Sequence, residues 1–256
     1  MAIDAKPAVV FLHGIGGSAR AWARQVESFT AAGYRPVALD APGYGTRPPV
    51  MTMDFAGLAA DLETAIEERK LDRPVLVGHS MGGMIVQTAL RRRPDAYRAA
   101  VLCCTSPAFG APTGDFQKKF IADRLAPLDA GGTMPALAAS IIDEILGPAP
   151  DPTGRTLAID SMAATPASTY RAAVNCIVSF DERGNLPNIR IPVLCLAGEH
   201  DRNAPAPMME RMAAKIPGAR TVVIPGVGHL PNVEAPHAFD TAIFDFLSRA
   251  RVPSSA

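Results

Sequence analysis

A serine between two glycines is the pattern in this chain that most directly suggests chemistry. Gly78-His79-Ser80-Met81-Gly82-Gly83 has the form G-x-S-x-G, with the apolar run Val75-Leu76-Val77 before it and a helix-like segment after it. A sharp strand-to-helix turn leaves no room for side chains beside the serine, so glycine is needed on both flanks. The pattern therefore predicts Ser80 as a nucleophile above the sheet edge, with the N–H groups of a helix N-terminus nearby.

A serine hydroxyl needs a base, and the base needs an acid that orients it. His229 follows the apolar run 221–225, and Asp201 follows the run 192–197. Both positions fall at the carboxyl ends of expected parallel strands, where α/β folds build their sites. The chain order Ser, Asp, His is the order of this architecture. We expect His229 as the base and Asp201 as the acid, with Glu199 as the alternative acid.

The glycine-rich segment His13-Gly14-Ile15-Gly16-Gly17 closes the first apolar run. A turn of this kind can direct the backbone N–H of Ile15 toward Ser80, where the N–H of Met81 would complete a two-donor oxyanion hole. Each such donor is worth about 3 kcal/mol in the transition state. A phosphate-binding loop is excluded because no Gly-Lys-Ser/Thr follows, and the spacing of a dinucleotide fingerprint is also missing.

Six short apolar runs rich in Val, Leu and Ile are expected to be strands, and helical patterns separate several of them. They span residues 8–12, 36–40, 74–78, 99–104, 192–197 and 220–225. Strands that are apolar on both faces belong in a sheet covered by helices on both sides, so we expect an α/β fold with a doubly wound, mostly parallel sheet.

Residues 1–7 are too few for two strands, so the strand at 36–40 is expected to lie at an edge without an N-terminal hairpin beside it. An uncovered edge invites pairing with a second chain, which leaves a monomer or a homodimer open.

Residues 107–188 interrupt the alternation and are interpreted as a helical cap inserted into a core of residues 1–106 and 189–256. Helical segments are expected at 115–125, 137–146 and 169–180, joined by linkers such as the Pro- and Gly-rich run 147–152.

Composition excludes several classes of function. Lys+Arg and Asp+Glu are both 25 among 256 residues, so charge gives no reason to expect nucleic acid or an anionic membrane as a partner. The four cysteines show no C-x-x-C spacing, and no metal or cofactor is expected. Cys103 and Cys104 are adjacent in an expected strand and should point to opposite faces. Buried, reduced thiols and the absence of a signal-peptide pattern indicate a cytoplasmic protein.

Taken together, these motifs resemble the α/β-hydrolase superfamily along nearly the whole chain, and within it 3-oxoadipate enol-lactonase and its relatives. The similar stretches include 80–87, 198–201 and 216–234. The resemblance implies a helical cap over the site and hydrolysis of a small carboxylic ester or lactone without a cofactor. Gly14 departs from the enol-lactonases, which have Ser there. Ser80 argues against the dehalogenase and epoxide hydrolase branches, which use Asp.

Other functions remain open at this point. A hydrolase that splits the carbon–carbon bond of meta-cleavage products, a perhydrolase or acyltransferase, and a non-enzymatic ligand receptor could all use this architecture. The substrate pocket between cap and sheet is expected to be mostly apolar, with Trp22 and Phe109 among its walls. If the substrate carries a carboxylate, burying it requires a cation, and Arg124 and Arg171 on the expected cap helices are the candidates.

Overall fold

The computed structural model describes residues 6–110 and 114–250, and six strands in these ranges form one sheet. Every neighbouring pair is parallel, and the order across the sheet is β2-β1-β3-β4-β5-β6. The strands are β1 (Ala8–Leu12), β2 (Arg35–Leu39), β3 (Val75–His79), β4 (Ala99–Cys103), β5 (Val193–Gly198) and β6 (Arg220–Ile224). The expected parallel sheet with the second strand at an edge is confirmed. The expectation about a hairpin concerns residues 1–7, of which 1–5 lie outside the described ranges.

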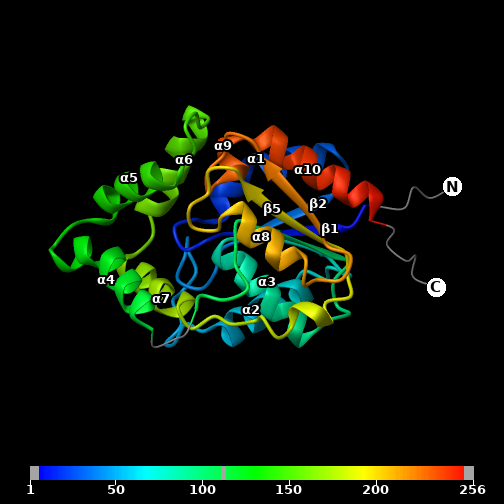
Figure 1. The fold of residues 1–256 in the computed structure, drawn as a ribbon, viewed down its shortest axis with the longest axis horizontal. Helices are drawn as coiled ribbons and strands as arrows, with labels where there is room; N and C mark the ends of the chain where they lie inside the picture. Colours follow the sequence, from blue (N-terminus) through cyan, green and yellow to red (C-terminus); the bar gives the residue numbers. More distant parts are fainter. Residues whose placement is uncertain (1–5, 111–113, 251–256) are drawn as a thin grey trace.

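Helices cover both faces of the sheet, as Figure 1 shows with α1 and α10 above the strands and α2 and α3 below. Alternate residues of β1 enter different apolar clusters: Val10 and Leu12 pack with residues of α2, α3 and α8, and Val9 and Phe11 with residues of α1 and α10. The core helices are α1 (Ala23–Ala31), α2 (Phe55–Glu68), α3 (Met81–Arg92), α8 (Ala206–Ala213), α9 (Pro231–Glu234) and α10 (Pro236–Arg249). Burial on both faces explains why the central strands are continuously apolar.

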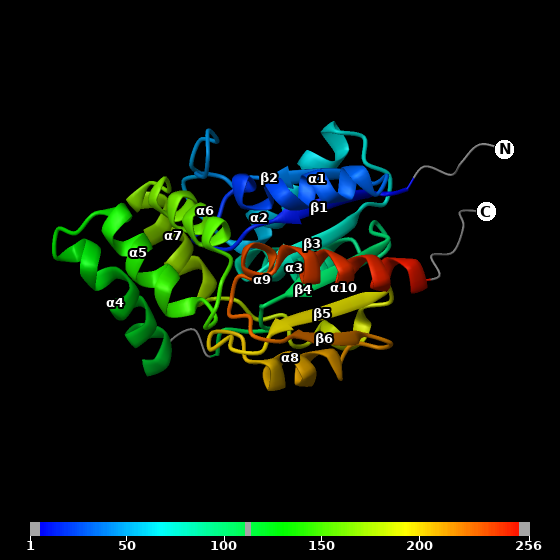
Figure 2. The same cartoon turned by 90° about the horizontal axis from the view of Figure 1, so that it is seen from above.

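Four helices form a cap beside the carboxyl ends of the strands, at the left of Figures 1 and 2. They are α4 (Asp115–Asp129), α5 (Met134–Ile145), α6 (Pro152–Ala163) and α7 (Ala167–Ile177), and they share a separate apolar cluster. None of the helices in the described ranges is long and apolar enough to cross a bilayer.

Helix α6 differs from the expectation, since the sequence pattern predicts a linker at 147–152 and no helix directly after it. The helix begins at Pro152, where the fixed φ of proline suits the first helical position. Asp151 caps it, since its Oδ1 accepts the N–H of Gly154 at 2.6 Å. A proline that ends a linker can equally start a helix.

The two chain segments that join cap and core lie side by side. The N–H of Phe109 donates to Phe180 O at 2.9 Å, and the N–H of Glu182 donates to Pro107 O at 2.9 Å. The carboxylate of Glu182 also accepts a hydrogen bond from Nε of Arg91 on α3 at 2.8 Å. The entry to the cap and the exit from it are therefore anchored to each other and to the core.

Replacing the N-cap of α6 should measurably destabilise the protein. Asp151→Ala is expected to lower the free energy of unfolding by about 1 kcal/mol, since the N–H of Gly154 loses its acceptor. Asp151→Asn keeps a capping oxygen and loses only the charge that faces Arg24 at 3.3 Å, so it should cost less. Urea unfolding followed by circular dichroism measures both. Equal losses would assign the effect to the ion pair.

Candidate active site

Ser80 lies on the turn between β3 and α3, and its backbone has φ 52° and ψ −117°. A residue with a side chain is strained in this conformation, at a cost of about 1–3 kcal/mol. A Cβ on Gly78 would lie 2.4 Å from Gly82 O, and one on Gly82 would lie 2.3 Å from Leu12 O. Glycine is therefore required at both flanks, as the motif indicated.

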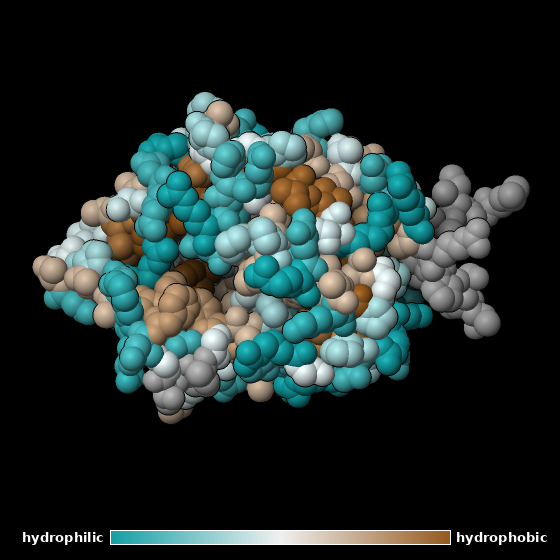
Figure 3. Space-filling view, in the orientation of Figure 1, coloured by the Kyte–Doolittle hydropathy of each residue, from teal (hydrophilic) through white to brown (hydrophobic). Residues whose placement is uncertain are grey.

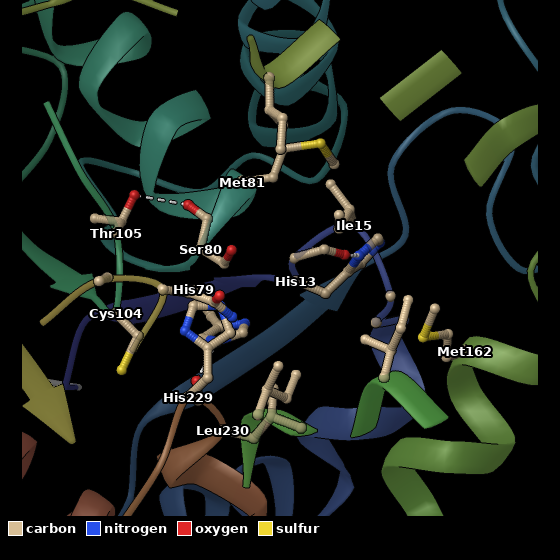
Figure 4. Close-up of a pocket in the computed structure, with 18 of the residues that line it drawn as sticks. His13, Ile15, His79, Ser80, Met81, Cys104, Thr105, Met162, His229 and Leu230 are labelled. Carbon is tan, nitrogen blue, oxygen red and sulfur yellow. Dashed lines mark hydrogen bonds between the residues drawn. The ribbon is translucent and has the colours of Figure 1, made fainter. Parts of the chain in front are cut away.

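Hydrogen bonds hold the serine turn in place on the neighbouring strand. The N–H of Ser80 donates to Cys103 O at 2.9 Å, and the hydroxyl of Thr105 donates to Ser80 O at 2.7 Å (Figure 4). Both partners belong to β4 or to the residues just after it. Within the described residues, no hydrogen bond joins Ser80 Oγ to the ring of His229, a contact that often tightens only when substrate binds.

Asp201 and His229 lie together after β5 and β6, which are neighbours in the sheet. Nδ1 of His229 is 2.8 Å from Oδ2 of Asp201, and both side chains are buried. The other carboxylate oxygen, Oδ1, accepts the N–H groups of Asn203 at 2.8 Å and Ala204 at 3.0 Å. With Nδ1–H donating to the carboxylate, Nε2 of His229 is the free basic nitrogen.

The electrostatic state of Asp201 suits an orienting acid. Burial acts to raise the pKa of Asp201, but the imidazole of His229 and the two backbone N–H groups outweigh it and hold the pKa well below its usual range. Glu199, the alternative acid, is about half exposed, and its carboxylate accepts the N–H of Gly226 at 2.8 Å. The structure brings Asp201, and not Glu199, against His229.

His79 supports His229 from the other side. Nε2 of His79 lies 2.7 Å from the backbone oxygen of His229, and the two rings are 4.9 Å apart between centroids, side by side in Figure 4. Since a carbonyl only accepts, Nε2 of His79 carries a proton. Burial, reinforced by the nearby imidazole of His229, lowers the pKa of His79 to about 3, so the ring is neutral.

The turn after β1 carries a second group of backbone donors. Ile15 and Met81 line the same cavity as Ser80, and within the described residues neither N–H donates a hydrogen bond to another group. His13 braces this turn: Nδ1 donates to Gly14 O at 2.8 Å, and Nε2 accepts the N–H of Ala41 at 3.1 Å. The hydroxyl of Tyr44 donates to Ile15 O at 2.9 Å, a support that the sequence did not reveal.

A cavity of about 360 Å³ connects these groups to the cap, and Figure 3 shows a brown-lined hollow between cap and core. Its walls are mostly apolar, as expected. Trp22 and Phe109 line it, although Trp22 also packs on Phe11 at 5.1 Å and Phe239 at 5.9 Å in the core.

Of the two candidate cations, only Arg124 lines the cavity. Its guanidinium lies 5.7 Å from the ring centroid of Phe120 and 3.4 Å from a carboxylate oxygen of Glu144. Arg171 is not among the residues that line the cavity, and its guanidinium pairs with Asp129. The face of a cap helix that points inward depends on how the four helices pack, which the spacing of one helix does not specify.

Cys104 is a further neighbour of the pair that the sequence did not reveal. Its sulfur lies within 4.8 Å of ligand atoms of Asp201 and His229, so these three could together hold a metal ion. Burial raises the pKa of the Cys104 thiol well above its usual value, which disfavours the thiolate that a metal requires. Cys103 and Cys104 enter the same apolar cluster, contrary to expectation, because Cys104 has φ 47° and breaks the strand alternation.

A hydroxyl on a strained turn, a buried imidazole oriented by a carboxylate, and two unengaged N–H groups can together perform acyl transfer. The Alpha/beta hydrolase family model matches residues 9–242, so the chain belongs to this family, as the resemblance implied.

Comparisons with individual proteins agree with this family. The chain is 29% identical over 255 residues to "Putative carbamate hydrolase RutD" of Variovorax paradoxus (strain S110), covering 96% of this chain and 93% of that protein. The enol-lactonase from Burkholderia xenovorans LB400 superposes with a TM-score of 0.84 at 26% identity, covering 95% of this chain and 92% of the other. Polyketide synthase ThaQ of Burkholderia thailandensis is 28% identical over 249 residues, but the chain spans only 12% of that protein.

Replacing His79 should flatten the pH dependence of stability. Between about pH 3 and 6.5 the unfolded chain binds a proton at His79 that the folded protein does not, so stability is full above this window and falls as the pH drops through it. His79→Gln, whose amide can still donate to His229 O, should remove up to about 1.4 kcal/mol per pH unit of this slope.

Urea unfolding at several pH values measures the slope. His200→Gln is the matched control, because the side chain of His200 is about half exposed. A slope that His79→Gln leaves unchanged would contradict a neutral, buried His79.

Proposed function

We propose that this chain hydrolyses small carboxylic esters or lactones through an acyl-enzyme on Ser80. The observation that carries the proposal is the 2.8 Å contact between His229 Nδ1 and Asp201 Oδ2, in a cavity that Ser80 shares with the unengaged N–H groups of Ile15 and Met81. A base that is oriented by a carboxylate and lies near a strained serine turn can activate the serine hydroxyl as a nucleophile.

The same groups act in both halves of the reaction, first in acylation of Ser80 and then in deacylation. Nε2 of His229 takes the hydroxyl proton as Ser80 Oγ attacks the carbonyl carbon, and the N–H groups of Ile15 and Met81 stabilise the oxyanion. The same proton then passes from His229 to the leaving alcohol as the carbon–oxygen bond breaks. In the second half, His229 takes a proton from a water molecule that attacks the acyl carbon. The bond from that carbon to Ser80 Oγ then breaks, the proton passes from His229 to Ser80 Oγ, and the carboxylic acid is released. Asp201 stays ionised throughout and stabilises the imidazolium.

The cavity supports a small, largely apolar substrate. A volume of about 360 Å³ lies at the lower end of the range for small-molecule sites. The enol-lactonase and carbamate hydrolase names of the similar proteins both describe a carbonyl carbon bearing a heteroatom leaving group. This agrees with attack by serine at a carbonyl and leaves ester, lactone and carbamate as the substrates to screen first.

Ser80 should be the sole covalent nucleophile. A fluorophosphonate probe is expected to label the wild-type protein once, and Ser80→Ala should abolish both the label and the turnover of a p-nitrophenyl ester. Intact-protein mass spectrometry measures the label, and circular dichroism confirms that the variant folds. Undiminished labelling of Ser80→Ala would contradict the assignment.

Asp201 should act as the orienting acid. Asp201→Asn is expected to lower kcat by about 10⁴, because the amide favours the wrong tautomer of His229. Glu199→Gln is the matched control and should leave kcat nearly unchanged, since that carboxylate bonds to the N–H of Gly226. If Glu199→Gln were the damaging change and Asp201→Asn the mild one, the acid would be Glu199.

Arg124 should matter only for substrates that carry a negative charge. Arg124→Ala is expected to lower kcat/KM for a carboxylate-bearing lactone by about 10-fold or more, because charged hydrogen bonds contribute about 1.5–3 kcal/mol, and to leave a neutral short-chain ester unaffected. Arg171→Ala is the control, because Arg171 lies outside the cavity. A wild-type preference for neutral esters that neither variant alters would leave a general esterase.

A further inference from the structure

The loop that follows α5 in the cap touches the loop that carries His229. A Cβ on Gly147 would lie 2.4 Å from Gly226 O, and a Cβ on Gly228 would lie 2.4 Å from Ile145 O. Neither Gly147 nor Gly228 has a positive φ, so space alone excludes a side chain at these positions. The two main chains therefore approach each other closely at these two glycines.

The carboxylate of Glu234 joins the two loops. Its Oε2 accepts the N–H of Gly147 from the cap at 2.6 Å and the N–H of Gly228 from the core at 2.9 Å. Its Oε1 accepts the N–H of Leu230 at 2.8 Å, and the side chain is buried. Three N–H donors on one buried carboxylate form strong, charge-assisted hydrogen bonds that fix the donors in position.

His229 lies between two of these donors, Gly228 and Leu230. Its own N–H donates to Ile145 O, at the end of α5, at 2.8 Å. Its carbonyl accepts Nε2 of His79 at 2.7 Å. The main chain on both sides of the proposed base is therefore held by the cap, by Glu234 and by His79.

We propose that Glu234 is a positioning residue, whose carboxylate fixes the His229 loop against the cap and so aims the imidazole at Ser80. Its effect on rate rests on the proposed function, and its effect on the His229 loop does not. The cap is then part of the support of the base as well as a wall of the substrate cavity.

Helix capping accounts for only part of the contacts of Glu234. The bond to Leu230 lies at the start of α9, and a capping role would explain it. Helix capping would not explain the other carboxylate oxygen, Oε2, which accepts the N–H groups of both Gly228 and Gly147. Gly147 belongs to the helical cap and is 87 positions away from Glu234 in the chain. If Glu234 only capped helix α9, its carboxylate would need no partner in the α5–α6 loop.

The first variant removes the charge and keeps the shape. Glu234→Gln retains one oxygen and places an NH₂ group opposite at least one N–H donor, so the three bonds cannot all form. We expect kcat for a p-nitrophenyl ester to fall about 10- to 100-fold, as for a misplaced catalytic group. KM should stay within about threefold, because no substrate contact is lost.

The matched control for this variant is Glu182→Gln. Glu182 is also a buried glutamate between cap and core, bonded to Arg91, but it does not contact the His229 loop. It should share any general effect on cap attachment and lower the melting temperature without the loss in kcat.

The second variant acts from the cap side. Gly147→Ala pushes the α5–α6 loop away from the His229 loop, and Gly147 itself does not line the cavity. We expect the same pattern, a lower kcat with little change in KM. Gly184→Ala is its control, because a Cβ on Gly184 has no atom within 4 Å.

Two readouts report on the His229 loop itself. The proton between His229 Nδ1 and Asp201 should give a far-downfield ¹H NMR resonance, identified by its loss in Asp201→Asn. We expect Glu234→Gln and Gly147→Ala to broaden or shift this resonance, and both controls to leave it unchanged. In the wild-type protein, the amides of Gly147, Gly228 and Leu230 should exchange slowly with solvent and at similar rates.

The proposal is overturned if Glu234→Gln lowers only the melting temperature while kcat and the downfield resonance stay as in the wild type. Should Glu234→Gln not fold, rapid exchange at Gly147 beside slow exchange at Gly228 would overturn it in the wild-type protein. If the resonance and exchange results hold but the wild-type protein turns over no ester, lactone or carbamate, the proposed function fails and the positioning of the loop stands.

Discussion

The site depends on the buried hydrogen bond between Asp201 and His229. Burying a carboxylate away from water costs free energy unless its charge is paired or hydrogen-bonded. The carboxylate of Asp201 is bonded to the imidazole of His229 and to two backbone N–H groups. The sheet makes this pairing possible, because β5 and β6 are parallel neighbours in which Gly198 pairs with Ile224. The loops that follow the two strands therefore begin side by side and bring the carboxylate of Asp201 against the imidazole of His229.

The core of this arrangement could be predicted from the sequence because its signals are local. The glycines around Ser80 are required by contacts within a few residues of the turn and by the strand next to it. Asp201 and His229 can be predicted as neighbours because each follows an apolar run typical of a buried strand, and the carboxyl ends of parallel strands meet at one edge. The alternation of strands and helices was sufficient to predict the sheet and its edge strand.

What could not be predicted depends on contacts between distant segments. Glu234 reaches a cap residue 87 positions away, and no spacing in the chain encodes that contact. The inward face of each cap helix is decided by packing among four helices, so Arg124 and Arg171 could not be told apart. Cys104 approaches Asp201 and His229 because its positive φ breaks the strand alternation, and residue type does not reveal such a conformation in advance.

Rapid-quench mass spectrometry of the wild-type protein can show whether an acyl group passes through Ser80. With an activated p-nitrophenyl ester, acylation should outpace deacylation. We predict a burst of p-nitrophenol equal to the number of protein chains, matched by one acyl group on the peptide that contains Ser80. An acyl group on any other residue, such as Cys104, or turnover that persists unchanged in Ser80→Ala, would contradict it.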